Sequence, residues 1–269
     1  MKIKYLGTAG SEGVPSIFCA CENCAKARAL GGRNIRTRSQ AIIDDTLLID
    51  FPCDTFYHIL NNNIDMFGIS ACLITHIHPD HMYPMDMRPD KNYGSVLNVY
   101  GNGAVGNRID VIPAEYHKYI NFNAVLPFVP FTVDGGYTVT ALKANHKTEN
   151  PYVYAISGNG KNILYLHDSG ILPDESWDYI KNTGICFDLI SLDCHWGDEE
   201  DKTVGGHGCL GVAKKLRERF IAEGMANNDT VFILNHFSHK GKNSVYDDFS
   251  LIAEASGFVV AYDSMEVTI

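Results

Sequence analysis

The sequence predicts one α/β domain spanning residues 1–269, in which two β-sheets pack face to face and helices cover their outer faces. Three observations favour this class. Short strand-like runs and helical stretches are interspersed along the whole chain. No internal repeat, low-complexity tract or long polar linker divides it. The composition, with 45% hydrophobic and 20% charged residues, is that of an ordinary globular protein.

Apolar runs bounded by Gly, Asn and Asp predict the strands. In chain order they are Lys2–Leu6, Ser39–Ile43, Thr46–Asp50, Ala71–Thr75, Leu97–Tyr100, Tyr137–Ala144, Tyr152–Ser157, Ile163–His167, Asp188–Asp193, Thr230–Asn235, Gly257–Tyr262 and Met265–Ile269.

The clearest predicted helix spans Cys209–Glu223, because its apolar residues recur on one face and Gly224 follows as a stop signal. That face holds Leu210, Ala213, Leu216, Phe220 and Ile221. Weaker helical patterns occupy Asn23–Leu30, Thr55–Leu60, Glu175–Lys181 and Tyr246–Ala255.

The bulk properties limit the partners. A net charge of −10 at pH 7, without a Lys/Arg-rich arm, disfavours a long nucleic acid. No apolar stretch approaches the roughly 20 residues of a membrane helix. The N-terminal run Met1–Gly7 begins a strand without a signal-like segment, so we expect a cytoplasmic protein with reduced cysteines. These properties do not decide the oligomeric state, and a homodimer is one alternative.

The motif Thr75-His-Ile-His-Pro-Asp-His81 predicts a metal site. It directly follows a predicted buried strand, whose end can hold ligands rigidly. Because alternate residues of an extended segment face the same way, His76 and His78 can bind one ion. Asp80 and His81 follow a proline that turns the chain, and they can face a second ion.

Such a pair of ions needs ligands from elsewhere, and three predicted strands end in suitable residues. His146 follows Tyr137–Ala144, Asp168 follows Ile163–His167, and His236 follows Thr230–Asn235. A lone histidine at a strand end is usually structural, but three such ends after this motif favour ligands. We therefore expect a cage of five imidazoles and two carboxylates.

The motif, followed in order by His146, Asp168 and His236, resembles the metallo-β-lactamase superfamily over nearly the whole chain. The resemblance implies an αββα sandwich of two mixed sheets with the metals at one edge. It further implies that His76, His78 and His146 hold the first ion. Asp80, His81 and His236 would hold the second, with Asp168 bridging. Redox members of the superfamily carry Glu where this chain has His78, which favours hydrolysis.

A second cluster, Cys19, Cys21 and Cys24, predicts a structural zinc loop over residues 19–24. A Cys-x2-Cys turn lets two sulfurs reach one tetrahedral ion, and His239 is the candidate fourth ligand. Unliganded thiols are the alternative, while a redox pair lacks its usual βαβ context. The other cysteines read as packing residues: Cys53, Cys72, Cys186, Cys194 and Cys209.

This loop, preceded by Gly-x-Ala-x-x-Glu-Gly-Val-Pro, resembles the phosphoribosyl 1,2-cyclic phosphate phosphodiesterase group, in which manganese often serves catalysis. It implies hydrolysis of a small cyclic phosphodiester by a hydroxide shared between two ions. The ligands suit Mn, Zn or Fe. Asp80 could orient the hydroxide. His207, between glycines, is the candidate acid for the leaving group or a phosphate contact, with a helix-start residue as the alternative.

Other functions on the same cage are alternatives, although no signal-like segment favours a secreted β-lactamase, no basic arm favours tRNA, and the complete ligand set argues against loss of catalysis. They are acyl hydrolysis of a lactone, β-lactam or thioester, tRNA 3′-processing, a metal-binding module without catalysis, and a role in pyrroloquinoline-quinone biosynthesis, whose protein shares a similar cysteine loop. Among the remaining polar residues, His195 is a candidate to line the pocket, and a position outside it is the equal alternative. His167 is expected in the core, His58 and His117 at the surface, and Asp50 beside a ligand imidazole.

Overall fold

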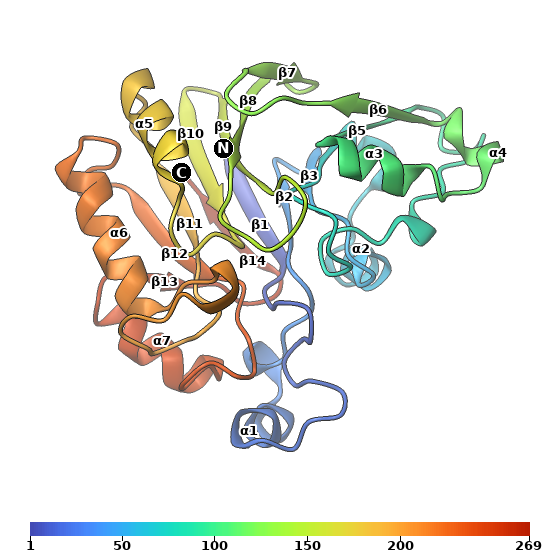
Figure 1. Cartoon of the computed structure of the whole chain (residues 1–269). Coiled ribbons are helices and arrows are strands. Elements are labelled where there is room, and N and C mark those ends of the chain that lie inside the picture. Colours follow the sequence, from blue (N-terminus) through green and yellow to red (C-terminus); the bar gives the residue numbers. More distant parts are fainter.

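Two seven-stranded sheets form the centre of the molecule (Figure 1). The computed structural model describes all 269 residues. The first sheet has the order β14-β1-β2-β3-β4-β5-β6. Its strands are β1 Lys2–Gly7, β2 Gln40–Ile43, β3 Leu47–Ile49, β4 Ala71–Leu73, β5 Leu97–Gly101, β6 Ile120–Ala124 and β14 Met265–Thr268.

The second sheet has the order β13-β12-β11-β10-β9-β8-β7. Its strands are β7 Phe131–Val133, β8 Tyr137–Lys143, β9 Tyr152–Gly158, β10 Lys161–Leu166, β11 Leu189–Asp193, β12 Val231–Asn235 and β13 Val259–Val260. Both sheets are mixed. The first is parallel from β3 to β6, and the second is parallel from β10 to β13.

Helices cover the outer face of each sheet, which completes an αββα sandwich (Figure 1). On the side of the first sheet lie α2 Thr55–Asn62, α3 Gly103–Ile109 and α4 Ala114–His117. On the side of the second lie α5 Asp174–Thr183, α6 Leu210–Ala222 and α7 Tyr246–Glu254. The remaining helix, α1 Glu22–Leu30, lies at the lower end in this view. The expected fold class is confirmed.

The core between the sheets explains why the strands read as continuous apolar runs. Tyr5 and Leu73 from the first sheet share one buried cluster with Tyr154, Ile163 and Ile233 from the second. A strand covered on both faces has no polar side, so its sequence does not alternate. Packing of the two sheets on this shared core fixes their relative position, so the ends of their strands form a rigid edge.

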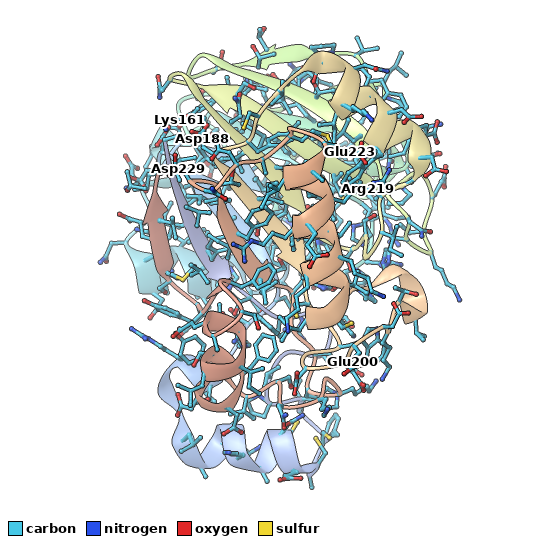
Figure 2. All side chains as sticks on the ribbon, turned by 90° about the vertical axis from the view of Figure 1, so that its left-hand side faces the viewer. Lys161, Asp188, Glu200, Arg219, Glu223 and Asp229 are labelled. Atoms are coloured by element: carbon cyan, nitrogen blue, oxygen red, sulfur yellow. The ribbon has the colours of Figure 1, made fainter.

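The longest helix, α6, shows how sequence sets the outer layer. Leu210, Ala213, Leu216 and Phe220 are buried as predicted, and Phe220 packs on Trp177 of α5 with ring centroids 4.6 Å apart. On the solvent side of the helix Arg219 pairs with Glu223 at 2.8 Å (Figure 2). Such an exposed pair adds at most about 1 kcal/mol, so burial of the apolar face stabilises α6.

Two strands and two α-helices were absent from the sequence-based expectation: β6, β7, α3 and α4. Most other boundaries agree within a residue or two, but the predicted strand Gly257–Tyr262 is reduced to Val259–Val260. His117, expected at the surface, lies in α4 and its Nε2 donates to the carbonyl of Ile112 at 2.7 Å. None of the helices combines the length and apolar content that a membrane crossing requires.

Candidate metal centre

The candidate ligands come from strand ends that meet at one edge of the sandwich. His76, His78, Asp80 and His81 follow β4, and His146 follows β8. Asp168 follows β10 and His236 follows β12. Asp168 and His236 have φ values of 51° and 62°, in the left-handed region that is unfavourable for side-chain-bearing residues. Backbone strain of this kind is tolerated where the surrounding fold imposes it, typically at functional sites.

Three imidazoles converge in a first group. The Nε2 atom of His76 lies 3.0 Å from Nδ1 of His78, which lies 3.1 Å from Nε2 of His146. Nitrogen ligands about 2.0–2.1 Å from a tetrahedral ion would be separated by about 3.3 Å, so this spacing suits one divalent cation. These three residues are the set expected for the first ion.

A second group surrounds Asp168. Its Oδ2 atom lies 2.7 Å from Nε2 of His81 and 3.3 Å from Nε2 of His236. Asp80 Oδ2 lies 3.4 Å from the same His81 nitrogen. The other Asp168 oxygen, Oδ1, lies 3.8 Å from Nε2 of His146 in the first group. Asp168 thus stands between the groups, as a bridging ligand would.

The donors fit divalent cations. Although Asp168 Oδ2 is buried and close to two imidazoles, its geometry makes no hydrogen bond with either. A buried carboxylate oxygen without a well-aligned hydrogen bond keeps part of its desolvation cost. A cation at the meeting point of these donors would remove that cost. Imidazole and carboxylate ligands suit Zn, Mn and Fe.

Further partners orient the imidazoles so that the other nitrogen faces the centre. His81 Nδ1 lies 2.7 Å from Oδ2 of Asp50, the neighbour expected for a ligand imidazole. His146 Nδ1 donates to the carbonyl of Gly205 at 3.0 Å. His236 Nδ1 lies 3.2 Å from Oδ2 of Asp193. Contacts of this kind fix the tautomer and ring orientation of metal-binding histidines.

The buried carboxylates of the site carry negative charge that a positive charge must balance. Burial opposes protonation of His81 and His236, but the surrounding carboxylates outweigh it. The pKa of His81 lies well above its ordinary value, and that of His236 rises to about 10. Conversely, burial is outweighed at Asp168, whose pKa is held well below its ordinary value by His236 and His81. Without cations, protons on imidazoles therefore balance the carboxylates.

An open cavity of about 330 Å³ leads to these residues. All but one of its lining residues have polar side chains, the exception being Pro79. They are Ser11, His78, Pro79, Asp80, His146, Asp168, His195, His207 and His236. His207 Nδ1 lies 3.0 Å from Asp193 Oδ2 and 3.2 Å from Asp168 Oδ1. Burial lowers the pKa of His207, but these carboxylates outweigh it and raise the pKa. The pocket is thus polar and has an imidazole able to carry a proton.

Sequence reasoning missed Asp193, which contacts both His207 and His236. The sequence offered only a weak signal for it, namely that Asp193 ends a buried strand. His167, expected in the core, is buried, and its Nε2 lies 2.8 Å from Ser191 Oγ. His58, expected at the surface, is instead fully buried, with Nδ1 2.6 Å from Gln40 Oε1, because α2 turns it toward the first sheet.

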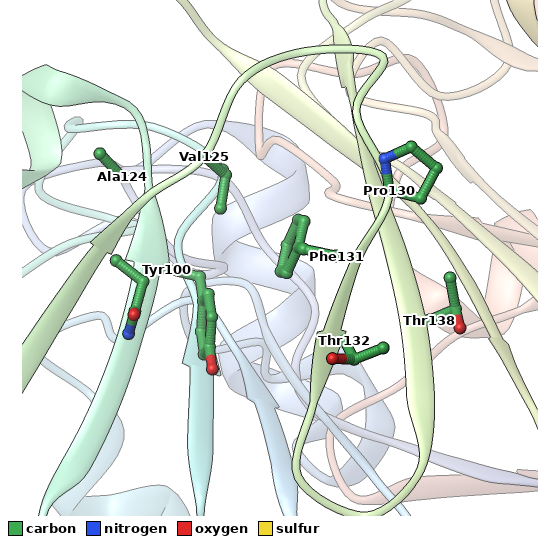
Figure 3. A pocket seen from close by; sticks show the side chains of 8 residues that line it. Tyr100, Ala124, Val125, Pro130, Phe131, Thr132 and Thr138 are labelled. Carbon is green, nitrogen blue, oxygen red and sulfur yellow. The ribbon is translucent and has the colours of Figure 1, made fainter.

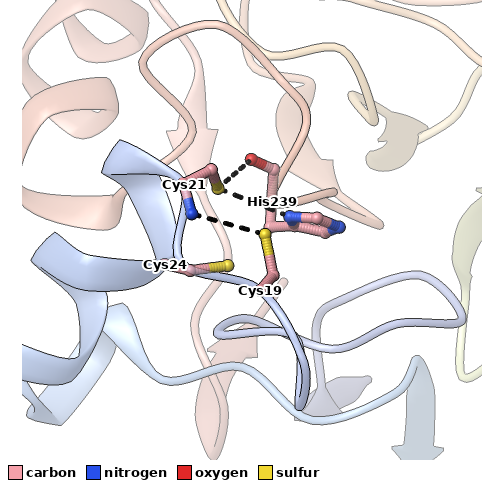
Figure 4. Close-up of side chains that lie close together, drawn as sticks. All are labelled: Cys19, Cys21, Cys24 and His239. Atoms are coloured by element: carbon pink, nitrogen blue, oxygen red, sulfur yellow. Dashed lines mark hydrogen bonds between the residues drawn. The ribbon is translucent and has the colours of Figure 1, made fainter.

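The cysteine cluster lies away from this cavity, beside the start of α1 (Figure 4). One ligand atom from each of Cys19, Cys21, Cys24 and His239 lies within 4.8 Å of the others. Cys21 Sγ is 3.6 Å from His239 Nδ1, and His239 Nε2 is 3.1 Å from Glu12. Three sulfurs and an oriented imidazole match a tetrahedral zinc site. Among the other cysteines, Cys72, Cys194 and Cys209 are buried, and Cys53 and Cys186 are half-buried.

Another open cavity, of about 590 Å³, lies between β6 and β7, where Tyr100 and Phe131 stack with centroids 5.3 Å apart (Figure 3). Its wall has no carboxylate or imidazole. The candidate ligands and the acid candidate therefore all lie at the other cavity.

An αββα sandwich with clustered His and Asp ligands at the strand ends defines a metallohydrolase-type fold and centre. The chain belongs to the β-lactamase superfamily, because the family model described as beta-lactamase superfamily domain matches residues 52–233. The match includes the candidate ligands from His76 to Asp168. His236, His239 and the cysteine loop lie outside it, so their proposed roles rest on geometry.

Solved structures share the fold over nearly their whole length. Zn²⁺-bound PqqB from Methylobacterium extorquens is 19% identical with a TM-score of 0.77, and each chain is covered completely. A diphosphatase of the PhnP family is 22% identical with a TM-score of 0.76, covering 99% of this chain and 97% of that one. Human tRNase Z, short form, is 16% identical with a TM-score of 0.67, covering 100% and 99%. A comparison with curated proteins gave no match.

Proposed function

We propose that the protein is a dinuclear metal-dependent phosphodiesterase that hydrolyses a small cyclic phosphodiester. The observation that carries this proposal is the cavity at the two ligand groups, where Asp168 and His207 meet and every lining residue except Pro79 has a polar side chain. A charged, strongly hydrated substrate suits such a pocket better than an acyl chain or an aromatic ring. The resemblance to the cyclic phosphodiesterase group supports this substrate class, and the fold shared with a PhnP-family diphosphatase supports hydrolysis of a phosphate-containing substrate.

The proposed ligands are His76, His78 and His146 for one ion and Asp80, His81 and His236 for the other, with Asp168 shared. Two divalent cations bound there would lower the pKa of water and neutralise charge on the phosphoryl group. Mn and Zn are the proposed ions, with Fe as a third option. A further zinc would bind Cys19, Cys21, Cys24 and His239 as a structural ion.

His207 has the proposed role of acid. Asp193 accepts a hydrogen bond from Nδ1 of its ring, which directs Nε2 away from that carboxylate. Because the neighbouring carboxylates raise the pKa of His207, the ring is able to hold a proton and give it to the departing alkoxide. The acidic net charge supports a small substrate rather than a long nucleic acid.

The deciding experiment measures hydrolysis of bis(4-nitrophenyl) phosphate and of glycerol 1,2-cyclic phosphate by Mn-loaded protein. Wild type should hydrolyse both. Asp80→Ala should lose turnover and bound metal, since it removes a ligand. His207→Ala should keep its metals but lose about 10²–10⁴-fold in rate on the cyclic alkyl ester. Its loss on the nitrophenyl ester should be smaller, because nitrophenolate leaves without needing a proton.

Asp86→Ala and His117→Ala are the matched controls, because these residues lie outside the cavity wall. Both should keep metal content and turnover. Metal-dependent hydrolysis of a lactone or thioester, with neither phosphodiester cleaved, would identify an acyl hydrolase instead. Absence of turnover on every ester would favour the cofactor-biosynthesis alternative, which the equally similar fold of PqqB supports.

A further inference from the structure

His195 is the imidazole in the cavity wall to which neither the ligand set nor the acid role assigns a function. It lies two residues beyond the end of β11, and its backbone N–H donates to Oδ1 of Asp193 at 3.0 Å. Its ring lies parallel to that of His207, with centroids 4.0 Å apart and an interplanar angle of 16°. Asp193 thus holds both histidines of a stacked pair.

The two ring nitrogens of His195 have different surroundings. Nδ1 is buried and has no hydrogen-bond partner. It faces Gly10, where an added Cβ would lie 3.3 Å from it. Because the ring lines the cavity and Nδ1 points into the protein, Nε2 is the nitrogen available to a bound molecule.

This asymmetry selects a tautomer. A neutral imidazole has one N–H. On Nδ1 that hydrogen would be a buried donor without an acceptor, and buried unpaired N–H groups are rare and costly. On Nε2 it points to the cavity, where water or a ligand can accept it. The favoured form therefore presents an N–H donor to the cavity.

The stacked partner supports a neutral ring. Two parallel imidazoles 4.0 Å apart would repel each other if both were protonated. Nδ1 of His207 lies 3.0 Å from Oδ2 of Asp193, so His207 is the ring of the pair that a carboxylate can keep protonated. The pair thus combines one ring that can hold an acidic proton with one that remains neutral.

We propose that His195 is a substrate-binding residue whose Nε2–H donates a hydrogen bond to a non-bridging oxygen of the phosphoryl group. This role rests on the proposed phosphodiesterase function and adds a donor to it. It separates two tasks within the stacked pair: His207 supplies a proton to the leaving group, and His195 keeps its own proton and positions the phosphoryl oxygens.

The first test reads the tautomer directly. Protein with ¹⁵N-labelled histidine is loaded with diamagnetic Zn²⁺ and titrated with inorganic phosphate, while calorimetry records phosphate binding. The His195 resonances are identified by their absence in His195→Gln. We expect an Nε2–H tautomer whose Nε2 signal shifts as phosphate binds. An Nδ1–H tautomer, or an unchanged signal with phosphate bound, would overturn the proposal.

The second test compares two substitutions. His195→Phe keeps a flat ring against His207 but has no donor, whereas His195→Gln offers an amide N–H. We expect His195→Phe to lose about 10- to 100-fold in kcat/KM, the range for a hydrogen bond to a charged group, with metal content and Tm unchanged. His195→Gln should regain most of that loss. Equal losses in both variants would contradict the proposal.

The two proposals can fail separately. If wild type cleaves no phosphodiester, the proposed function is wrong, yet the tautomer and its response to phosphate still decide the role of His195. If wild type is active and His195→Phe is fully active, the inference on His195 is wrong and the phosphodiesterase proposal stands.

Discussion

At the scale of single residues, each candidate ligand depends on a neighbour that the motif does not contain. Asp50 fixes the His81 ring, and Asp193 contacts both His236 and His207. The motif from Thr75 to His81 could be recognised in the sequence because its ligands are close together along the chain. Asp193 could not, because one Asp at a strand end is common. Its importance depends on which residues the fold places around it.

The balance between carboxylates and imidazoles predicts how the metal-free protein responds to pH. The pKa of His236 is about 10 in the folded protein, against about 6.5 when unfolded, and that of His81 is also raised. Protonation of these rings therefore stabilises the fold fully below pH 6.5, and the contribution is lost as pH rises through about 10. We expect the Tm of EDTA-treated protein to fall across that window.

Metal affinity should increase as pH rises, whereas the Tm of the metal-free protein falls, because cations displace the same protons. Titration of Zn²⁺ in two buffers of different ionisation enthalpy should show proton release near neutral pH and tighter binding at pH 8 than at pH 6. A Tm of the EDTA-treated protein that increases from pH 6.5 to 10, or metal binding without proton release, would contradict this account.

At the scale of elements, the sequence predicted the buried strands and the amphipathic helices but not the pair α3 and β6. Two glycines in α3 weakened its helical pattern, and β6 has polar residues as an edge strand. Close packing of α3 on β6 requires a glycine at position 106, because a Cβ there would lie 2.6 Å from the Phe122 ring of β6. Asn102 supplies the missing start signal by accepting hydrogen bonds from Ala104 and Val105 N–H groups.

The loop before α6 positions two functional groups and allows little change. Gly206 has φ of 85°, and an added Cβ would lie 2.1 Å from the carbonyl oxygen of Asn145. Gly206→Ala should therefore displace the loop that carries His207 and the carbonyl of Gly205, at a cost of about 1–3 kcal/mol or more. We expect a lower free energy of unfolding in urea and a loss of turnover.

Gly224→Ala separates backbone strain from the clash. Gly224 has a similar φ of 77°, but nothing lies within 4 Å of an added Cβ. The backbone strain in this variant should lower its free energy of unfolding by a comparable amount, while its turnover should be unchanged. If both alanine variants kept full activity, the loop would not be the rigid support described above.

At the scale of the whole molecule, the αββα class could be predicted because sheets and helices follow from local patterns and from family resemblance. The meeting of the N-terminal cysteine loop with His239 was expected only from the need for a fourth ligand. The structure brings them together, and Asn23 donates to the carbonyls of His239 and Gly241 at 2.9 and 2.8 Å.

This long-range contact predicts a stability effect. Cys21→Ser should remove one zinc equivalent and lower the Tm by about 5–10 °C, corresponding to a few kcal/mol at about 2–4 °C per kcal/mol. Cys186→Ser is the control, because Cys186 is half-buried outside the cluster and should keep its metal. Metal analysis and thermal melts check both, and an unchanged metal count in Cys21→Ser would refute the zinc site.

The five residues from Asn235 to His239 have a consequence for how the protein is made. They carry His236, the proposed ligand of the candidate metal centre, and His239, the proposed ligand of the cysteine cluster, while the other candidate ligands lie upstream. During synthesis from the N-terminus, both proposed sites therefore lack a ligand until this short segment leaves the ribosome. The second ion and the structural zinc would therefore bind late, whereas the ligands proposed for the first ion, His76, His78 and His146, are already present.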